Sequence, residues 1–200
     1  MRSQGLKVTE SVEEMFEKSG AVLRGHFLLA SGLHSPVYWE KFQVLQFPEY
    51  TEELCRIIAD HFRESGIQVV AGPTTGGIIL AYEVARQLGV RGIFAEKEDT
   101  GGRAFRRGFR IDPGERVLIV DDVFTRGGSI RDTIDAVNKL KGNIVGIGVM
   151  VDRSPQKVEF NVPFFSCHRA EAVTYRPEDC PLCADGVPLV KPGSSQQSPK

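Results

Sequence analysis

The chain has 200 residues, of which 41% are hydrophobic and 26% charged, and this is the composition of one folded domain with a substantial core. Its formal net charge of −1 gives no reason to expect nucleic acid or another polyanion as a partner. No apolar run approaches the roughly 20 residues of a membrane span, and the first ten residues lack the apolar core of a secretion signal. We therefore expect a cytoplasmic protein without membrane attachment.

The N-terminal part predicts one helix followed by irregular extended segments. Ser11 and Glu14 have the spacing of a capping box, and Gly20 ends the helical pattern. Short extended pieces broken by glycine and proline follow over residues 25–47, which predicts a hairpin or an irregular cap. We call this expected cap, about residues 20–45, the hood.

Helical and strand-like segments then alternate along the chain. The predicted strands are 67–72, 90–97, 116–120 and 143–151, and the predicted helices lie around 54–62, 74–89 and 130–140. Continuous apolar strands in this alternation predict an α/β fold, with a central, mostly parallel sheet of about five strands flanked by helices. The expected organisation is a single domain over 1–190, with a core at 48–152, a C-terminal segment at 153–190 and a disordered tail at 191–200.

The cysteines do not form a disulfide framework, because they are few and unevenly placed: Cys55, Cys167, Cys180 and Cys183. Cys180 and Cys183 have the spacing of a zinc knuckle, but the nearby sequence offers only Cys167 and His168 as further ligands. We therefore expect reduced thiols in a C-terminal segment rather than a zinc site.

The segment Val117–Ile130 joins an apolar strand to two acidic residues and a glycine-containing turn. Residues 125–129 lead into a predicted helix, whose N-terminal N–H groups and dipole favour a phosphate. Asp121 and Asp122, expected at a solvent-facing strand end, need donors such as vicinal ribose hydroxyls or a hydrated magnesium ion. A plain turn with an Asx cap is the alternative, but the flanking strand and helix argue against it. A phosphate beside a diol describes a ribose 5-phosphate.

Two more polar motifs follow predicted strands, at the sheet edge where ligands of open parallel sheets bind. They are AGPTTGG at 71–77 and AEKEDTGGR at 95–103. The second opens the segment 98–115, which is long, glycine-rich, basic and without period, and such a loop in a compact domain is usually functional.

The stretch VLIVDDVFTRGGS resembles the phosphoribosyl pyrophosphate signature of type I phosphoribosyltransferases, two acidic residues followed by a Thr-x-Gly-x-Ser phosphate loop. GHFLLASGLHSPVYWEKF and VDRSP resemble segments of orotate phosphoribosyltransferases, and the resemblance covers about residues 20–155. It implies the type I fold and the conversion of orotate and phosphoribosyl pyrophosphate to orotidine 5′-phosphate and pyrophosphate, in pyrimidine biosynthesis. It also implies Mg2+ as cofactor and a homodimer in which the loop 98–107 reaches the partner's site.

The same resemblance assigns roles to residues of this chain. The residues with implied catalytic roles are Lys97, Arg103, Asp121 and Asp122. The implied phosphoribosyl pyrophosphate site comprises Thr75, Lys97, Asp121, Asp122, Val123, Phe124, Thr125, Arg126, Gly127, Gly128 and Ser129. The implied orotate site comprises Tyr38, Trp39, Thr125 and Arg153. Magnesium is expected to be held mainly by phosphoribosyl pyrophosphate, with no direct protein ligand other than Asp121 or Asp122.

Other residues of these motifs have simpler interpretations. Tyr38 and Trp39 alternate faces of a strand, so one of them should pack rather than contact the base. Arg106 and Arg107 fit a solvated basic pair. His26 and His34 fit ordinary surface histidines, because nothing local specifies a partner.

The sequence departs from the family pattern at the expected cations. Many members have lysine where this chain has Ala30, with Lys41 the nearest replacement, and a Tyr-Lys pair where it has Thr75 and Gly76. One pyrophosphate-binding cation is therefore missing from its usual position. The alternatives are a purine-type phosphoribosyltransferase and a non-catalytic regulator that retains the phosphoribosyl pyrophosphate site and binds nucleic acid or effectors. The retained acidic pair and the orotate-like SGLHSPVYW argue against the purine enzyme, and the near-zero net charge without a basic stripe argues against nucleic acid.

Overall fold

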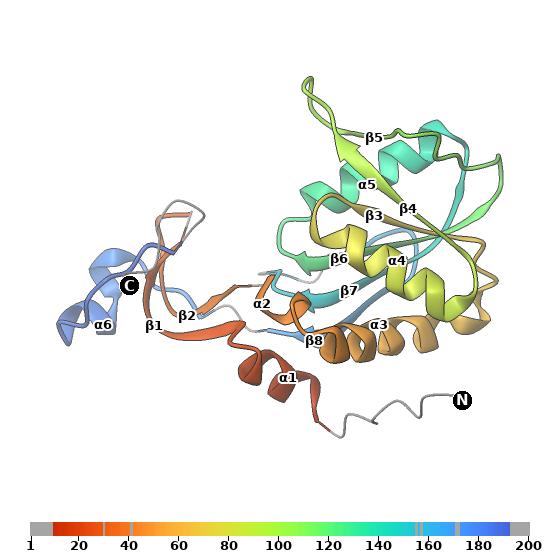
Figure 1. Ribbon diagram of the computed structural model, residues 1–200. Coiled ribbons are helices and arrows are strands. Elements are labelled where there is room, and N and C mark those ends of the chain that lie inside the picture. The colour runs from red at the N-terminus through yellow and green to blue at the C-terminus, as the bar shows by residue number, and fades with distance from the viewer. Residues whose placement is uncertain are drawn as a thin grey trace.

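The structure is a computed structural model that describes residues 10–29, 31–40, 42–154, 156, 158–170 and 173–192. The replacement positions Ala30 and Lys41, and residues 193–200 of the expected tail, lie outside the described residues. A sheet covered by helices forms one part of the molecule, and a hairpin with the C-terminal segment beside it forms a smaller part (Figure 1).

The central sheet has six strands in the order β5-β4-β3-β6-β7-β8. They are β3 (Val69–Pro73), β4 (Arg91–Lys97), β5 (Arg103–Phe105), β6 (Arg116–Phe124), β7 (Asn143–Asp152) and β8 (Phe164–Arg169). Every neighbouring pair is parallel except β4 and β5. The predicted α/β fold with a mostly parallel sheet is confirmed, and β8 and the edge strand β5 are the strands that the sequence patterns missed.

Helices cover both faces because the sheet strands are apolar on both sides. Helices α3 (Pro48–Phe62) and α4 (Gly76–Leu88) pack against one face, where Leu118 and Val120 of β6 are buried. Helix α5 (Gly128–Lys139) packs against the other face, where Ile119 is buried. Successive residues of β6 thus alternate between two cores, as the two-residue period of a strand requires.

The hood is built from short elements around a two-stranded antiparallel sheet. These are β1 (Val22–Leu28), β2 (His34–Trp39) and α2 (Phe42–Leu45), and helix α1 (Val12–Lys18) precedes them. The predicted capping box of α1 is confirmed, since Ser11 and Glu14 exchange both backbone-to-side-chain hydrogen bonds. The C-terminal segment, with η2 (Pro177–Asp179) and α6 (Pro181–Ala184), lies along the hairpin (Figure 1).

Two boundaries of the predicted elements are wrong. Strand β6 continues to Phe124 rather than ending at Val120, because residues 121–124 keep their parallel pairing with β7. The predicted structureless loop 98–115 contains β5, which folds back on β4 as an antiparallel hairpin. Among the residues that the structure describes, no helix is both long and apolar enough to cross a membrane.

Candidate active site

The polar motifs meet at the point where the strand order reverses. In the strand order, β4 is the neighbour of β3 on one side and β6 is its neighbour on the other side. The turn from β3 into α4 and the turn from β6 into α5 are therefore neighbours at the carboxyl ends of adjacent parallel strands. Such a switch point is where open α/β sheets bind their ligands.

The turn between β6 and α5 has the geometry of a phosphate-binding loop. Gly127 is the N-cap of α5, with φ 74°, and no side chain caps the first turn of this helix. A Cβ on Gly127 would overlap the ring of Phe124, so the close turn requires glycine here. Thr125, Arg126 and Gly128 are exposed, and the first N–H groups of α5 lack partners within the helix. This arrangement favours an anion at the helix N-terminus.

The two aspartates are buried within β6, which corrects the expectation that they face solvent. Asp121 is 5% exposed and Asp122 is 2% exposed. The carboxylate of Asp121 accepts hydrogen bonds from the Asp122 backbone N–H (2.9 Å) and from the Ser129 hydroxyl (2.7 Å). That of Asp122 accepts one from the Val123 N–H, at 2.6 Å. Ser129 thereby ties the first turn of α5 to the acidic pair.

The turn between β3 and α4 packs tightly against the acidic pair. A Cβ on Gly76 would overlap the carboxylate of Asp122, and a Cβ on Gly72 would overlap the Gly77 carbonyl. Glycine at these positions lets the two turns approach each other. Thr75, a predicted phosphoribosyl pyrophosphate contact, is the exposed N-cap of α4 and follows a cis peptide bond.

Arg103 places a cation beside this turn. Its guanidinium donates hydrogen bonds to the Thr74 hydroxyl (2.9 Å) and carbonyl (3.2 Å) and to the Ala95 carbonyl (3.1 Å). The residue is 9% exposed, and its Nε has no hydrogen-bond partner among the described residues. Lys97 pairs with Arg103 in the β4–β5 register and is exposed.

The other two arginines of the hairpin bind carboxylates at the surface. Arg107 pairs with Glu96 at 2.7 Å and Arg106 with Glu98 at 3.4 Å, as expected of a solvated basic pair.

The predicted orotate residues lie at the same edge of the sheet. The Arg153 backbone N–H donates to the carbonyl of Phe124, at 2.8 Å, which places Arg153 directly beside the phosphate loop. Its guanidinium is half-buried and makes no hydrogen bond or ion pair with the described part of the chain. Desolvation lowers the pKa of Arg153, and the nearby Tyr38 opposes that shift.

Trp39 is the member of the aromatic pair that packs. Its ring meets Phe16, with centroids 5.3 Å apart, and His168, at 5.7 Å. Tyr38 lies on the other side of the strand, against Phe27 (5.7 Å between centroids). Tyr38 is therefore the better placed of the two for the base.

A family model for the phosphoribosyl transferase domain matches residues 43–180. The orotate phosphoribosyltransferase of Pelotomaculum thermopropionicum is 54% identical to this chain over 185 residues, which are 92% of this chain and 97% of the relative. The chain belongs to the orotate phosphoribosyltransferase family. The solved orotate phosphoribosyltransferase of Aeropyrum pernix is 26% identical, with a TM-score of 0.65 over 79% of this chain and 93% of that protein. The adenine phosphoribosyltransferase of Saccharomyces cerevisiae shares the fold at 18% identity, with a TM-score of 0.60 over 78% of this chain and 98% of that protein, so the fold does not identify the base.

The structure overturns the interpretation of the hood histidines and gives the last cysteines neighbours that the nearby sequence did not offer. His26 and His34 are 2% and 5% exposed, so neither is a surface residue. Cys180 and Cys183 lie beside these histidines rather than beside Cys167 and His168. These histidines and cysteines are visible in the sequence, but they are brought together by an irregularity in the β1–β2 pairing and by contacts between distant segments, and neither has a local sequence pattern.

Proposed function

We propose that this protein transfers a phosphoribosyl group from phosphoribosyl pyrophosphate to orotate, forming orotidine 5′-phosphate and pyrophosphate in pyrimidine biosynthesis. The observation that carries the proposal is the position of Arg153. The backbone of Arg153 is bonded to the strand that leads into the phosphate loop, and its half-buried guanidinium lies near Tyr38 without a hydrogen-bond or ion-pair partner in the described part of the chain. Orotate carries a carboxylate, and a planar guanidinium binds a carboxylate through two parallel hydrogen bonds.

The phosphate loop and the acidic pair would hold the ribose 5-phosphate. The N–H groups at the start of α5, including that of Ser129, and the hydroxyl of Thr125 would donate to the 5′-phosphate, while the Ser129 hydroxyl holds Asp121. Asp121 and Asp122 accept hydrogen bonds from the ribose hydroxyls. Val123 lies in β6 between these groups, and Phe124 anchors the loop through its contacts with Phe160 and Phe164 in the core.

Departure of pyrophosphate leaves positive charge on the ribose ring and places negative charge on the leaving group. Asp121 and Asp122 stabilise the first charge, because buried carboxylates act in a medium of low dielectric constant. Lys97 and Arg103 stabilise the second, with Thr75 at the N-terminus of α4. The Arg103 guanidinium, bonded to Thr74 of the same turn, could replace the lysine that the family resemblance leads one to expect at position 76.

The buried acidic pair is already held by hydrogen bonds within the protein, two to Asp121 and one to Asp122. A carboxylate accepts more than two hydrogen bonds, so the pair can also hold ribose hydroxyls or the waters of a hydrated magnesium ion. We propose that Mg2+ is held mainly by the phosphates of phosphoribosyl pyrophosphate, with Asp121 or Asp122 as its nearest protein groups. When bound, it would supply charge neutralisation for the pyrophosphate leaving group.

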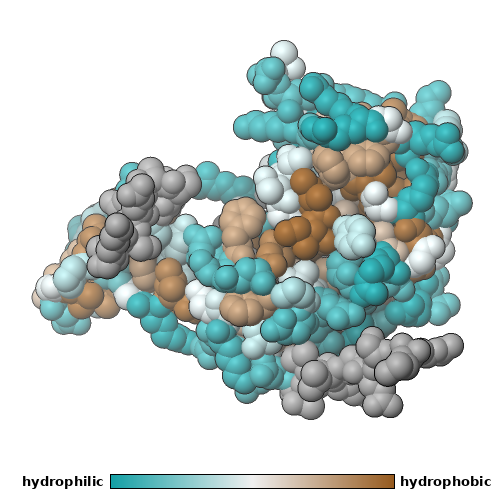
Figure 2. Space-filling model, in the orientation of Figure 1, coloured by the Kyte–Doolittle hydropathy of each residue, from teal (hydrophilic) through white to brown (hydrophobic). Residues whose placement is uncertain are grey.

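We also propose a homodimer in the cytoplasm. Figure 2 shows apolar surface gathered between the hood and the helices of the sheet, and α2 and α4 expose Phe42, Ile79 and Tyr82, which are 48%, 43% and 69% exposed. Exposed apolar clusters of this kind mark protein interfaces. The tip of the β4–β5 hairpin extends beyond the sheet (Figure 1), so residues 98–102 are those that would reach a partner's site. The cysteines form no disulfide, as is usual in a reducing compartment.

The test of the proposed function is the ultraviolet absorbance of orotate on mixing with enzyme, magnesium and phosphoribosyl pyrophosphate. We expect a loss of orotate absorbance that stops when chelator is added and does not occur without phosphoribosyl pyrophosphate. Consumption of hypoxanthine or adenine instead would show a purine enzyme, and consumption of no base would show a non-catalytic binding protein.

A further inference from the structure

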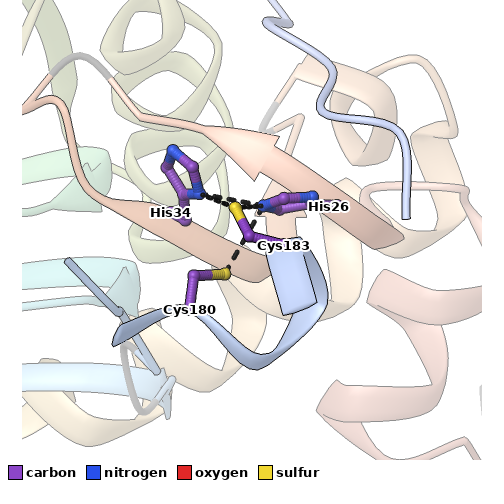
Figure 3. A group of neighbouring side chains, drawn as sticks. All are labelled: His26, His34, Cys180 and Cys183. Atoms are coloured by element: carbon purple, nitrogen blue, oxygen red, sulfur yellow. Dashed lines mark hydrogen bonds between the residues drawn. The ribbon is translucent and has the colours of Figure 1, made fainter. Parts of the chain in front are cut away.

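Four potential metal ligands converge in the hood, outside the active site. His26 of β1, His34 of β2, and Cys180 and Cys183 at α6 point toward one another (Figure 3). Their ligand atoms all lie within 4.8 Å of one another, and all except Cys183 are buried. Nothing in the proposed transfer of the phosphoribosyl group uses these side chains.

Three nitrogen–sulfur distances between these atoms are close to those between the ligands of one tetrahedral zinc ion. Zn–S bonds of about 2.3 Å and Zn–N bonds of about 2.0–2.1 Å place a nitrogen and a sulfur ligand roughly 3.5 Å apart, and two nitrogens roughly 3.3 Å apart. The observed distances are 3.3 Å from Cys183 Sγ to His34 Nδ1, and 3.5 and 3.7 Å from His26 Nε2 to the two sulfurs. The two ring nitrogens are 2.9 Å apart, so a small separation would admit the ion.

The tautomer of His26 is set for metal binding. Its Nδ1 lies 2.8 Å from the carbonyl oxygen of Val187, which can only accept a hydrogen bond, so Nδ1 must carry the proton. The neutral ring therefore presents the lone pair of Nε2 to the cluster. A metal-bound histidine almost always donates its other N–H to such a partner, which fixes the orientation of the ring.

The backbone brings the two pairs of ligands together from distant parts of the chain. The pairing of β1 with β2 is irregular between Arg24 and Phe27, and this bulge contains His26. Bulges commonly re-aim a side chain. His34 exchanges two backbone hydrogen bonds with Tyr175, both at 2.9 Å, and Val190 exchanges two with residues 26 and 28. The chain is therefore attached to the hairpin both before and after α6.

We propose that His26, His34, Cys180 and Cys183 bind one structural Zn2+ ion that fastens the C-terminal segment to the hood. Both cysteines lose their thiol protons on binding, and the two thiolates balance the charge of the ion. Four protein ligands leave no open coordination position, so the site is structural rather than catalytic. Thiolate and imidazole ligands select zinc over magnesium, which prefers oxygen. The ion would brace the hairpin that carries Tyr38.

The test is the metal content of the full chain, expressed without a polyhistidine tag and purified anaerobically in reducing buffer. We expect about one zinc per chain after gel filtration. Replacement by cobalt should give the strong visible bands of a tetrahedral ion and a thiolate charge-transfer band. Cys183→Ser should lose both signals and lower zinc affinity by at least about 100-fold, because even loss of a supporting outer contact costs 10- to 100-fold.

Cys167→Ser is the matched control, since Cys167 lies outside the cluster and its Sγ faces the Leu54 carbonyl at 3.5 Å. This variant should keep one zinc and the cobalt spectrum. The proposal is overturned if the wild-type chain takes up no stoichiometric zinc under reducing conditions, or if Cys183→Ser binds it as well as the control does. It is also overturned if Cys180 and Cys183 form a disulfide in the protein purified in reducing buffer. The wild-type cobalt spectrum decides the question even if the serine variant does not fold.

Discussion

Removing the guanidinium of Arg153 should selectively weaken the binding of orotate. The side chain is half-buried and lacks a hydrogen-bond or ion-pair partner among the described residues, so the carboxylate of orotate would be its first strong acceptor. Charge-assisted contacts of this kind contribute about 1.5–4 kcal/mol. Since each 1.4 kcal/mol is a factor of ten, Arg153→Ala should raise KM for orotate by about 10- to 1000-fold.

The assay is initial-rate kinetics with each substrate varied in turn. KM for phosphoribosyl pyrophosphate should change little, because the hydrogen bond from Arg153 to the Phe124 carbonyl is made by its backbone N–H, which the substitution keeps. Arg153→Lys should give an intermediate KM, since lysine keeps the charge but not the bidentate geometry. If both constants rise together, Arg153 belongs to the phosphate site or the scaffold. If neither changes, the orotate carboxylate binds elsewhere.

Three further outcomes follow from the site geometry. Asp121→Asn should lower kcat by on the order of 100-fold while shifting Tm by only a few degrees, because the isosteric amide keeps the packing; thermal scans showing a collapse of the fold would make the role structural. Gly127→Ala should lower the free energy of unfolding by about 1–3 kcal/mol in urea titrations, since φ is 74° and the Cβ overlaps a ring, whereas Gly128→Ala, with open space around it, should not. If the site is shared between subunits, mixed Lys97→Ala and Asp122→Asn proteins should recover about one quarter of wild-type activity, and no recovery after verified exchange would place the loop in its own subunit's site.

The sheet and the glycine turn between β6 and α5 could be predicted because their signals are local. Apolar runs and helical spacing give the order of β3, α4, β4, β6, α5 and β7, and the carboxyl ends of parallel strands meet at one edge. The capping box at Ser11 is likewise contained within four residues.

What the sequence did not reveal depends on long-range contacts. Strand β8 is short and only half-buried, and its place in the sheet comes from pairing with β7. The burial of Asp121 and Asp122 follows from the continued pairing of β6 and from the close approach of the α4 turn. The histidine and cysteine cluster joins residues about 150 positions apart, through a bulge and two isolated bridges that have no sequence pattern.

The preference between orotate and uracil tests the central claim most directly, because the two bases differ by one carboxylate. The measurement is kcat/KM for each base in the wild-type enzyme at saturating phosphoribosyl pyrophosphate and magnesium, with adenine and hypoxanthine alongside. A site built around the half-buried Arg153 guanidinium, which has no hydrogen-bond or ion-pair partner among the described residues, predicts a preference for orotate of at least about 100-fold over each other base, since the other bases offer this charge no carboxylate. Equal use of uracil, or faster use of either purine, would contradict the account.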